Sequence, residues 1–426
     1  MNILITGASG FIGSHLTRAL SLQHEVVACV RNPQRMTNRF VGIKTVTVDF
    51  SANLSVDDWL PLLEGVDVVI NAVGILRETR RQTFELLHHQ APCSLFQACE
   101  QATVRKVIQI SALGADETAF SQYHLSKKAA DDDLQQRELD WVIIKPSLVY
   151  GPGGKSAAFF KALSALPLIP VVDTGEQRVQ PIHIDDLTDT ICALLTSEAP
   201  VRLSIDAVGS SPISIKDMLL QYRHWFGIIP ENILHVPYPL ALLAGKVGGF
   251  LGNSTLSGEA IQMLSRGNTG DVSILQQTLQ ISPRSLATAL CEQPAEQADR
   301  WHARLFFLRP FLRISIGLLW LFTGMVSLGL YPIEQSYALL SEVGVHGWLA
   351  PLALFGAALL DMALGVATLS RFRIQLVGKL QIILMLGYSI LISMGLSEMW
   401  LHPFGPITKN VPLIIATMIM LSLEKD

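Results

Sequence analysis

Three polar side chains stand in an order and at a spacing that suit proton transfer to a carbonyl oxygen. Ser111 ends an apolar run, Tyr123 lies twelve positions later, and Lys127 follows four positions beyond Tyr123. Residues four apart share one face of a helix, so the last two side chains would point the same way. A tyrosine has a pKa of about 10, and a nearby ammonium group lowers that value by stabilising the phenolate.

This order predicts three roles. Ser111 would hydrogen-bond a substrate oxygen, Tyr123 would act as general acid, and Lys127 would activate Tyr123 while binding a nucleotide ribose. The alternative is that each residue is structural, because a Tyr-x-x-x-Lys pattern by itself is common by chance. A second signal therefore has to come from the elements that position these residues.

A glycine-rich turn near the N-terminus is that second signal. It follows the apolar run Asn2–Thr6 and leads into an expected helix over Phe11–Leu20. Strand, glycine turn and helix form a dinucleotide-binding pattern, in which phosphates lie at the helix N-terminus. The first glycine permits a sharp turn, the second lets the backbone approach a pyrophosphate, and the third lets helix and strand pack closely. The alternative is an ordinary βα turn. The cofactor-binding candidates in this loop are Gly7, Ser9, Gly10, Phe11, Ile12 and Gly13.

Four further apolar runs, over 25–31, 45–50, 66–74 and 106–111, predict strands that place more candidates around the nucleotide. Arg31 ends the second strand, with Arg35 nearby, where NAD-preferring folds usually carry Asp or Glu. A guanidinium group suits a 2′-phosphate, which favours NADP(H) over NAD(H), although a solvated arginine is the alternative. Asp49 would meet the adenine amino group. The remaining cofactor-binding candidates are Arg31, Asp49, Phe50, Ala72, Val73, Gly74, Tyr123, Lys127 and Pro146.

These elements predict an α/β Rossmann domain, a doubly wound parallel sheet, over residues 1–292. A helix is expected over 81–102, and the segment 212–290 is expected to be helical and to complete a small C-terminal substrate lobe. The apolar run 238–251 is interpreted as a lobe helix or an interfacial surface. His183 with Asp185 and Asp186 is interpreted as a strand-to-helix turn capped by Asp, and no metal site is expected there.

The composition changes past Arg300, after a linker predicted over 293–309. Residues 310–426 contain long stretches with at most one charge, and about 20 apolar residues cross a bilayer. We expect an all-α domain of four transmembrane helices, with a lipid bilayer as partner. A carboxylate within a membrane usually faces a partner or a cavity, so Asp361 is expected to pair with Lys379 or a hydroxyl, or else to relay protons or contact a quinone. The expected spans are about 314–331, 348–369, 374–396 and 405–423.

Basic residues near the expected spans predict their orientation. They lie before the first span, between the second and third, and after the fourth, whereas the other two loops hold only Lys409. The positive-inside rule then places both termini in the cytoplasm of a multi-pass protein of the cell inner membrane. A net charge of −4 without a basic block excludes electrostatic support for nucleic-acid binding. Five cysteines without a CxxC pair indicate reduced thiols.

Three segments carry a resemblance to a known family: Val107–Asp116, Lys145–Gly153 and Gln180–Leu187. Together with the glycine turn and the Ser111, Tyr123 and Lys127 order, they resemble the extended and atypical branch of the short-chain dehydrogenase/reductase superfamily, over about residues 1–290. The group they resemble is that of the NADPH-binding accessory subunit of respiratory complex I. This resemblance implies a bound NADP(H), and for that subunit a nucleotide held structurally. Lys145 stands where the family usually has Arg.

The C-terminal part resembles the DoxX-like membrane family. The likeness lies in three segments: 313–324, 356–365, and the turn 402–406 with Lys409 and Asn410. It implies an association with respiratory membranes and, in some members, with quinone-linked oxidation. Three functions therefore stand open. They are a membrane-anchored NADP(H)-dependent oxidoreductase for a hydrophobic carbonyl or a quinone, a non-catalytic NADPH-binding assembly factor or redox sensor for a membrane complex, and an epimerase or dehydratase.

Overall fold

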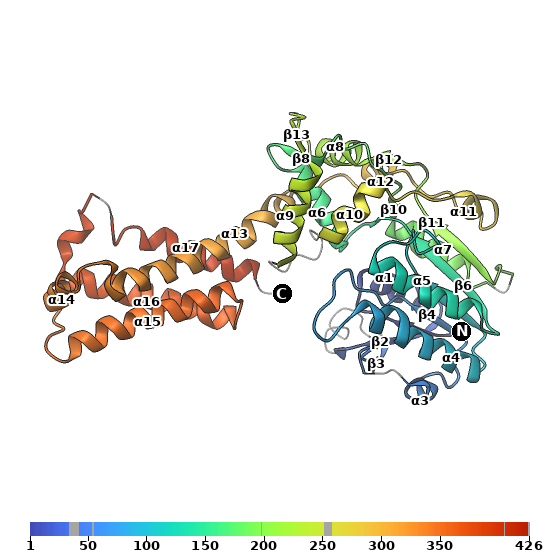
Figure 1. Ribbon diagram of the computed structural model, residues 1–426, viewed down its shortest axis with the longest axis horizontal. Coiled ribbons are helices and arrows are strands. Elements are labelled where there is room, and N and C mark those ends of the chain that lie inside the picture. Colours follow the sequence, from blue (N-terminus) through green and yellow to red (C-terminus); the bar gives the residue numbers. More distant parts are fainter. Residues whose placement is uncertain (34–41, 53–54, 197, 251–257, 404, 425–426) are drawn as a thin grey trace. The chain divides into compact units, whose positions relative to one another are not determined.

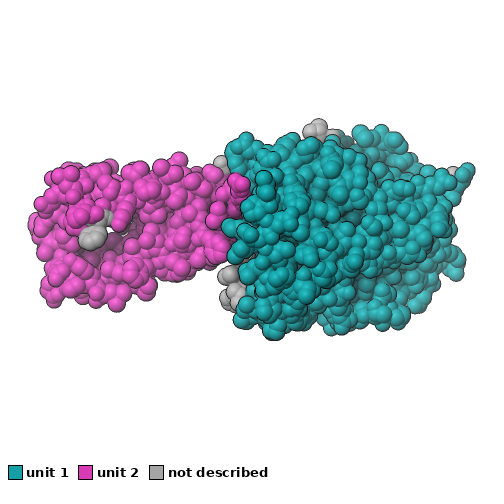
Figure 2. All heavy atoms as spheres, turned by 90° about the horizontal axis from the view of Figure 1, so that it is seen from above, with its two compact units in different colours: residues 1–303 teal, residues 304–426 magenta. Residues whose placement is uncertain are grey.

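A parallel sheet of seven strands forms the centre of the first of two compact units, residues 1–303 and 304–426 (Figures 1 and 2). The computed structural model describes residues 1–426 except 34–41, 53–54, 197, 251–257, 404 and 425–426. Arg35 and part of the turn 402–406 therefore lie outside the described residues. In spatial order the strands are β11 (Leu203–Ala207), β6 (Asp140–Pro146), β5 (Lys106–Ile110), β4 (Val68–Asn71), β1 (Asn2–Thr6), β2 (Glu25–Val30) and β3 (Lys44–Thr47).

Both faces of this sheet are covered, which confirms the predicted doubly wound fold. Along β1, Ile3 and Ile5 point into one core and Leu4 into the other, because side chains alternate along a strand. Parallel sheets need such cover on each face. The first core includes residues of α1 (Phe11–Leu20) and α7 (Ile184–Ala193). The second includes residues of α3 (Val56–Trp59), α4 (Ala91–Gln101) and α5 (Gln122–Gln135).

The chain reverses its direction of travel across the sheet at β1. It passes from β1 to β2 and β3 on one side and then returns to β4 on the other. Ligands of open parallel sheets bind outside the carboxyl ends of strands at such a switch point. There Thr6 Oγ1 donates to Asn71 Oδ1 at 2.6 Å, and Asn71 Nδ2 donates to Gln109 Oε1 at 2.7 Å. This buried chain of side chains holds the ends of β1, β4 and β5 in place.

Two boundaries differ from the sequence predictions. The third strand ends at Thr47, so Asp49 and Phe50 lie in the loop that follows it. The helix expected from residue 81 starts as a π-helix, η2 (Glu85–Gln90), and continues as α4. Pro92 in the first turn of α4 has no N–H to donate to a preceding carbonyl, which removes one α-helical bond at this junction.

The remaining elements of unit 1 build a lobe. The segment 212–290 is mainly helical, as expected, but it also contains two strands, and these pair with strands 34 to 64 residues earlier in the chain. Pairing at that separation leaves no local pattern in the sequence. The lobe elements are β7 (Val149–Tyr150), α6 (Lys155–Ser164), β8 (Ile169–Val172), β9 (Arg178–Val179), β10 (Ile182–His183), β12 (Ile213–Ser214), α8 (Ile215–Trp225), β13 (Ile233–Val236), α9 (Tyr238–Phe250), α10 (Gly258–Arg266), α11 (Ser273–Gln277) and α12 (Leu286–Glu292).

Unit 2 is entirely helical in its described part. Three helices are long and apolar enough to cross a membrane, over Gln297–Leu330, Leu349–Leu369 and Ile374–Gly395. The first of them begins inside the segment predicted as a linker. The helix at the fourth predicted span, α17 (Asn410–Leu423), has only 14 residues, a rise of about 21 Å. The fourth span therefore stays a prediction. The elements are α13 (Gln297–Met325), η3 (Val326–Leu330), α14 (Ile333–Glu342), α15 (Leu349–Leu369), α16 (Ile374–Gly395), η4 (Ser397–Trp400) and α17 (Asn410–Leu423).

Small residues let the helices of unit 2 approach closely. A Cβ atom on Gly365 would lie 2.8 Å from the carbonyl oxygen of Gly317, and one on Gly324 would lie 2.7 Å from that of Ala358. Helix α13 thus packs on α15 backbone to backbone, as is typical of membrane helices. Asp361 on α15 is buried, and among the described residues neither an ion pair with Lys379 nor a hydrogen bond to its Oδ1 is present. The expected pairing with Lys379 is therefore wrong.

We expect Gly365→Ala to destabilise unit 2 by about 1–3 kcal/mol, because its methyl group would overlap the backbone of α13. The measurement is the unfolding temperature of the full chain in detergent micelles. Gly356→Ala on the same helix is the matched control, since no described atom lies within 4 Å of the added methyl group. Equal unfolding temperatures for the two variants would contradict the packing described.

Candidate functional site

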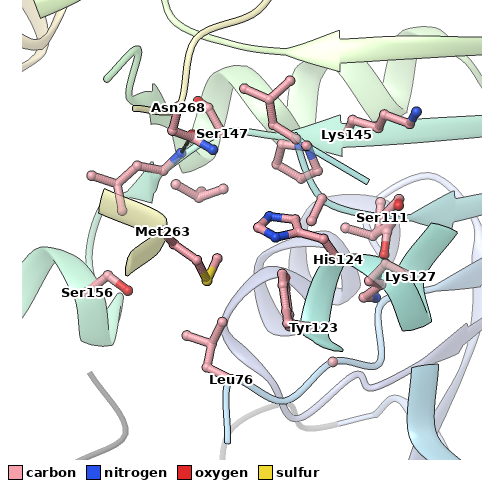
Figure 3. A pocket seen from close by; sticks show the side chains of 18 of the residues that line it. Leu76, Ser111, Tyr123, His124, Lys127, Lys145, Ser147, Ser156, Met263 and Asn268 are labelled. Carbon is pink, nitrogen blue, oxygen red and sulfur yellow. Dashed lines mark hydrogen bonds between the residues drawn. The ribbon is translucent and has the colours of Figure 1, made fainter. Parts of the chain in front are cut away.

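A cavity of about 760 Å³ opens at the carboxyl ends of β1, β4, β5 and β6 (Figure 3). It brings together all three residues predicted to act on a substrate, Ser111, Tyr123 and Lys127. Part of the predicted nucleotide set lines it as well: Gly10, Phe11, Ile12, Ala72, Val73, Gly74 and Pro146. The predicted residues that do not line it are Gly7, Ser9, Gly13, Arg31, Asp49 and Phe50.

The glycine turn has the geometry that its sequence predicts. Gly7 has a φ of +68°, and a Cβ atom there would lie 2.7 Å from the carbonyl oxygen of Ala72. A Cβ atom on Gly13 would lie 2.2 Å from the carbonyl oxygen of Gly7, so only glycine lets α1 pack against this turn. Gly10 is the N-cap of α1 and supplies no side-chain cap. The first N–H groups of α1 therefore face the cavity without a side-chain cap, in the arrangement that binds phosphate.

Lys127 is buried and links α5 to two strand ends. Its Nζ donates to the carbonyl oxygen of Val73 at 3.1 Å and to that of Ile110 at 2.9 Å. Burial lowers the pKa of this ammonium group, while the negative charge of Asp131 acts in the opposite direction. An ammonium group has three donors, so one remains for a ligand or for Tyr123.

Ser111 does not present a free hydroxyl hydrogen to the cavity. Its Oγ donates to the carboxylate of Asp131, which lies one helical turn beyond Lys127 on α5. Burial raises the pKa of Asp131, and the bond from Ser111 opposes that shift. The prediction that Ser111 bonds a substrate oxygen therefore requires this hydroxyl to reorient, or its acceptor to take up a proton. The sequence pattern did not single out Asp131, although its i, i+4 spacing from Lys127 was visible.

The ring of Tyr123 is held by edge-to-face contacts with three rings. The centroid distances are 5.9 Å to Phe84, 5.3 Å to His88 and 5.2 Å to His124. Such contacts fix a ring orientation without using its hydroxyl group. Figure 3 shows Tyr123 and His124 side by side at the start of α5, both directed into the cavity.

His88 is fully buried and its hydrogen bonds fix its tautomer. The backbone N–H of Ile75 donates to Nε2 at 2.9 Å, so the proton resides on Nδ1, which lies 3.1 Å from Ser126 Oγ. Ser126 Oγ in turn donates to the carbonyl oxygen of Tyr123 at 2.9 Å. Burial lowers the pKa of His88 to about 2, and the positive charge of Lys127 adds to this effect. A neutral His88 thus joins the loop after β4 to the helix that carries Tyr123.

His124 is a second residue that sequence reasoning missed. It is buried, and its Nδ1 lies 2.8 Å from the hydroxyl of Ser121, the N-cap of α5. Its ring stands against Gly114, where a Cβ atom would approach Nε2 to 3.3 Å. Burial lowers the pKa of this imidazole. A histidine directly after the Tyr-x-x-x-Lys tyrosine was the available signal.

Three of the predicted cofactor residues that do not line the cavity, Phe50, Asp49 and Arg31, lie outside the glycine turn. Phe50 is a core residue that packs on Trp59 with a ring centroid distance of 5.2 Å, and its role in cofactor binding stays a prediction. Asp49 accepts hydrogen bonds from the backbone N–H and hydroxyl of Ser51. These bonds lower the pKa of Asp49, with a smaller effect from the nearby charge of Arg31. Arg31 is exposed at the end of β2 and remains accessible to a ligand.

The turn at His183 differs in one detail from its prediction. His183, not an aspartate, is the N-cap of α7, and its Nδ1 accepts the N–H of Asp185 at 3.3 Å. Asp186 instead binds Arg284, whose Nε donates to its Oδ1 at 2.9 Å. His183 therefore caps a helix, and Asp186 forms an ion pair with Arg284.

Two family models match separate parts of the chain. Residues 7–160 match an NAD(P)H-binding family, and residues 317–418 match the DoxX-like family. A ceramide reductase of Caulobacter vibrioides is 26% identical over 248 residues, which is 58% of this chain and 76% of that protein. Subunit 9 of the alpha subcomplex of mitochondrial NADH dehydrogenase from Arabidopsis thaliana is 26% identical over 261 residues, 58% of this chain and 63% of that protein.

Solved structures agree on the fold. The UDP-glucuronic acid 4-epimerase of Bacillus cereus superposes with a TM-score of 0.54 at 20% identity, covering 72% of this chain and all of that one. The chain therefore joins an NAD(P)H-binding domain that is similar to short-chain dehydrogenases/reductases to a DoxX-like part whose apolar helices suit a membrane. Both resemblances inferred from the sequence motifs are confirmed.

Because His88 is neutral in the folded state down to a pH of about 2, we expect stability to fall on acidification. The unfolded chain binds a proton at this residue below pH of about 6.5, so each lower unit costs up to about 1.4 kcal/mol. Unfolding temperatures of the full chain between pH 7.5 and 5 measure this slope. His88→Asn should flatten it, while His89→Asn, at the half-buried neighbouring position, should keep it. A slope that His88→Asn leaves unchanged would refute this interpretation.

Proposed function

We propose that this protein is a membrane-anchored, NADP(H)-dependent oxidoreductase that reduces the carbonyl group of a hydrophobic substrate. One observation carries the proposal. Tyr123, with Lys127 one helical turn away, lines the same cavity as the uncapped N-terminus of α1. A general acid, its activating cation and a phosphate-binding helix end then meet at the topological switch point of the sheet.

The residues present fit a dinucleotide. The glycine turn has no room for side chains at Gly7 and Gly13, so α1 packs closely on it, and the N-terminus of α1 offers N–H groups to a pyrophosphate. Arg31 lies exposed at the end of β2, where a 2′-phosphate would be bound, and no carboxylate replaces it. These features support NADP(H) over NAD(H), and the third donor of Lys127 is available to a nicotinamide ribose.

In the proposed reaction the cofactor supplies a hydride to the carbonyl carbon. Tyr123 donates its phenolic proton to the oxygen, and the positive charge of Lys127 stabilises the phenolate that remains. Ser111 orients the substrate oxygen once its hydroxyl turns away from Asp131. The carbonyl groups of Val73 and Ile110 keep the ammonium group in position throughout.

The outer part of the cavity supports a hydrophobic substrate. Leu76, Phe120, Met263 and Leu264 line it, and Arg266 lies 3.7 Å above the ring of Phe120. A relative whose name is ceramide reductase is consistent with a carbonyl-bearing lipid, and a quinone has similar chemistry. An epimerase would use the same residues without net consumption of NADPH.

A non-catalytic role is the second candidate, and one observation favours it. The hydroxyl of Ser111 donates its hydrogen to Asp131 and is not free to bond a substrate. A nucleotide-binding subunit without turnover does not need that hydroxyl for a substrate. The plant relative named as a subunit of NADH dehydrogenase is consistent with that role, in which the protein would serve as an assembly factor or redox sensor of a membrane complex.

The proposed location is the cell inner membrane, with both termini in the cytoplasm. Arg371, in the loop between α15 and α16, donates to Glu424 at 2.6 Å, and Arg309 on α13 lies 3.5 Å from the same carboxylate. Two of the basic residues that predict a cytoplasmic side, Arg309 and Arg371, thus lie at one end of unit 2, which supports the proposed orientation.

We expect Tyr123→Phe to lower kcat for NADPH-dependent reduction at least about 100-fold, because general acid catalysis contributes about that much. The assay follows NADPH oxidation by the full chain in nanodiscs that contain a long-chain keto-amide lipid or a ubiquinone analogue. Tyr150→Phe is the matched control, since the hydroxyl of Tyr150 is buried without a partner among the described residues and lies outside the cavity. Retention of NADPH through purification, with no turnover of either substrate, would favour the non-catalytic role.

We expect Arg31→Ala to raise the Kd for NADPH about tenfold or more and to leave the Kd for NADH nearly unchanged. A hydrogen bond to a charged phosphate contributes about 1.5–3 kcal/mol, and NADH lacks this phosphate. Fluorescence titration of both nucleotides measures the ratio, with Arg18→Ala, at the other end of α1, as control. Equal losses for both nucleotides would contradict a 2′-phosphate site at Arg31.

A further inference from the structure

One edge of the lobe exposes large apolar side chains that no described residue of unit 1 covers. We define the lobe edge by five residues of β13, α9 and the segments beside them, with exposed fractions between 47% and 86%. Scattered exposed leucines are ordinary on a soluble protein, but a contiguous group marks an interaction surface. The lobe edge consists of Leu168, Ile229, Leu234, Leu240 and Leu243.

The backbone makes these residues neighbours. β13 pairs with β8 in parallel, with Ile233 opposite Ile169, so Leu168 and Leu234 lie at the same end of a two-stranded ribbon. The chain then enters α9, and the carboxylate of Asp173 at the end of β8 accepts the N–H of Tyr238 at 2.9 Å. In Figure 1 the ribbon of β8 and β13 and helix α9 form one border of the lobe. Leu240 and Leu243 are three positions apart and share one face of α9.

The carboxylates next to the lobe edge already have hydrogen-bond partners. Glu231 lies 2.6 Å from Nε2 of His224, and Asp173 is bonded to the start of α9. His235 donates its Nδ1 hydrogen to the carbonyl oxygen of Asp173 at 2.7 Å. Between Tyr238 and Lys246 the described part of α9 has no charge except Lys246 itself. A surface with its carboxylates paired is suited to an apolar environment.

A lipid bilayer is the occupant that the chain itself supplies. Unit 1 ends at Ala303, and the uncharged stretch of the first membrane-spanning helix begins at Ile314. Eleven residues of helix rise about 17 Å, so a bilayer surface is held within that distance of unit 1 by covalent connection. Trp301 in the first turns of α13 is 59% exposed, and tryptophan at such a position is typical of the membrane–water interface.

We propose that the lobe edge rests in the headgroup layer of the bilayer in which the chain is anchored. Helix α10 packs on α9, with the space around Gly258 closed by Leu242 and Lys246, and its Met263 and Leu264 line the cavity. The two helices therefore separate the lobe edge from the substrate part of the cavity. A lipid ketone leaves the bilayer along this pair of helices. That route rests on the proposed function, whereas the contact with lipid does not.

Lipid quenching of a fluorophore tests the contact. Leu243→Cys is introduced into the full chain with Cys93, Cys192 and Cys291 replaced by Ser, labelled with an NBD dye, and placed in nanodiscs with spin-labelled phosphatidylcholine. We expect at least about threefold more quenching than for Leu22→Cys, which is exposed on the turn after α1. Leu234→Cys repeats the test on β13. Equal quenching at the lobe edge and at residue 22 overturns the proposal, as does a blue-shifted emission without quenching, which would indicate a protein partner or a second copy.

A second experiment separates the contact from the reaction. We expect Leu240→Asp with Leu243→Asp to lower turnover of a bilayer-resident keto-lipid about tenfold and to leave turnover of a short-chain, water-soluble analogue unchanged. Equal effects on both substrates would overturn the route along α9 and α10. If the unmodified protein reduces neither substrate, the proposed function fails, and the quenching experiment alone decides whether the lobe edge meets lipid.

Discussion

The buried ammonium group of Lys127 is the interaction on which the candidate site depends. A buried charge is costly unless it is well bonded, and the carbonyl groups of Val73 and Ile110 supply those bonds. Ile110 ends β5 and Val73 lies two residues after the end of β4, so Lys127 fixes α5 against the sheet at the height of the cavity. Tyr123 shares that helix and takes its position from the same bonds. The ring contacts of His88 add the loop after β4 to this arrangement.

The two units place their large apolar side chains in opposite ways. In unit 1 the large apolar side chains fill two cores, one on each face of the sheet. In unit 2 many of them point outward, and small residues such as Gly317 and Gly365 take the close contacts between helices. Because lipid tails are as apolar as leucine, burying leucine between membrane helices adds no hydrophobic stabilisation. Burying glycine lets the helix backbones approach closely and gain van der Waals contact. The lobe edge of unit 1 also exposes large apolar side chains, and it is there that we propose a contact with lipid.

The fold leaves the chemistry open, because the same sheet carries reductases, epimerases and subunits without turnover. The bond between Ser111 and Asp131 is the feature of this site that bears on the choice between turnover and nucleotide holding. A serine that donates to a buried carboxylate cannot also donate to a carbonyl oxygen, since it has one hydrogen. Burial raises the pKa of Asp131, and a protonated Asp131 would no longer need the hydrogen of Ser111, so the bond between these two groups bears directly on the proposed reduction.

Local patterns in the sequence were enough to predict the strand–glycine–helix start, the strands of the parallel sheet and the apolar helices. They also gave the order of Ser111, Tyr123 and Lys127. Each of these features depends on residues that lie close together in the sequence. The tertiary structure alone decided what meets across distance. The pairing of β13 with β8, the bond from His88 to Ser126 and the burial of Phe50 in a core shared with Leu4 and Val107 depend on segments far apart in sequence, and no local period encodes such contacts. The acceptor of the Ser111 hydroxyl belongs to this second class, because only the packing of α5 on β5 brings Asp131 to it.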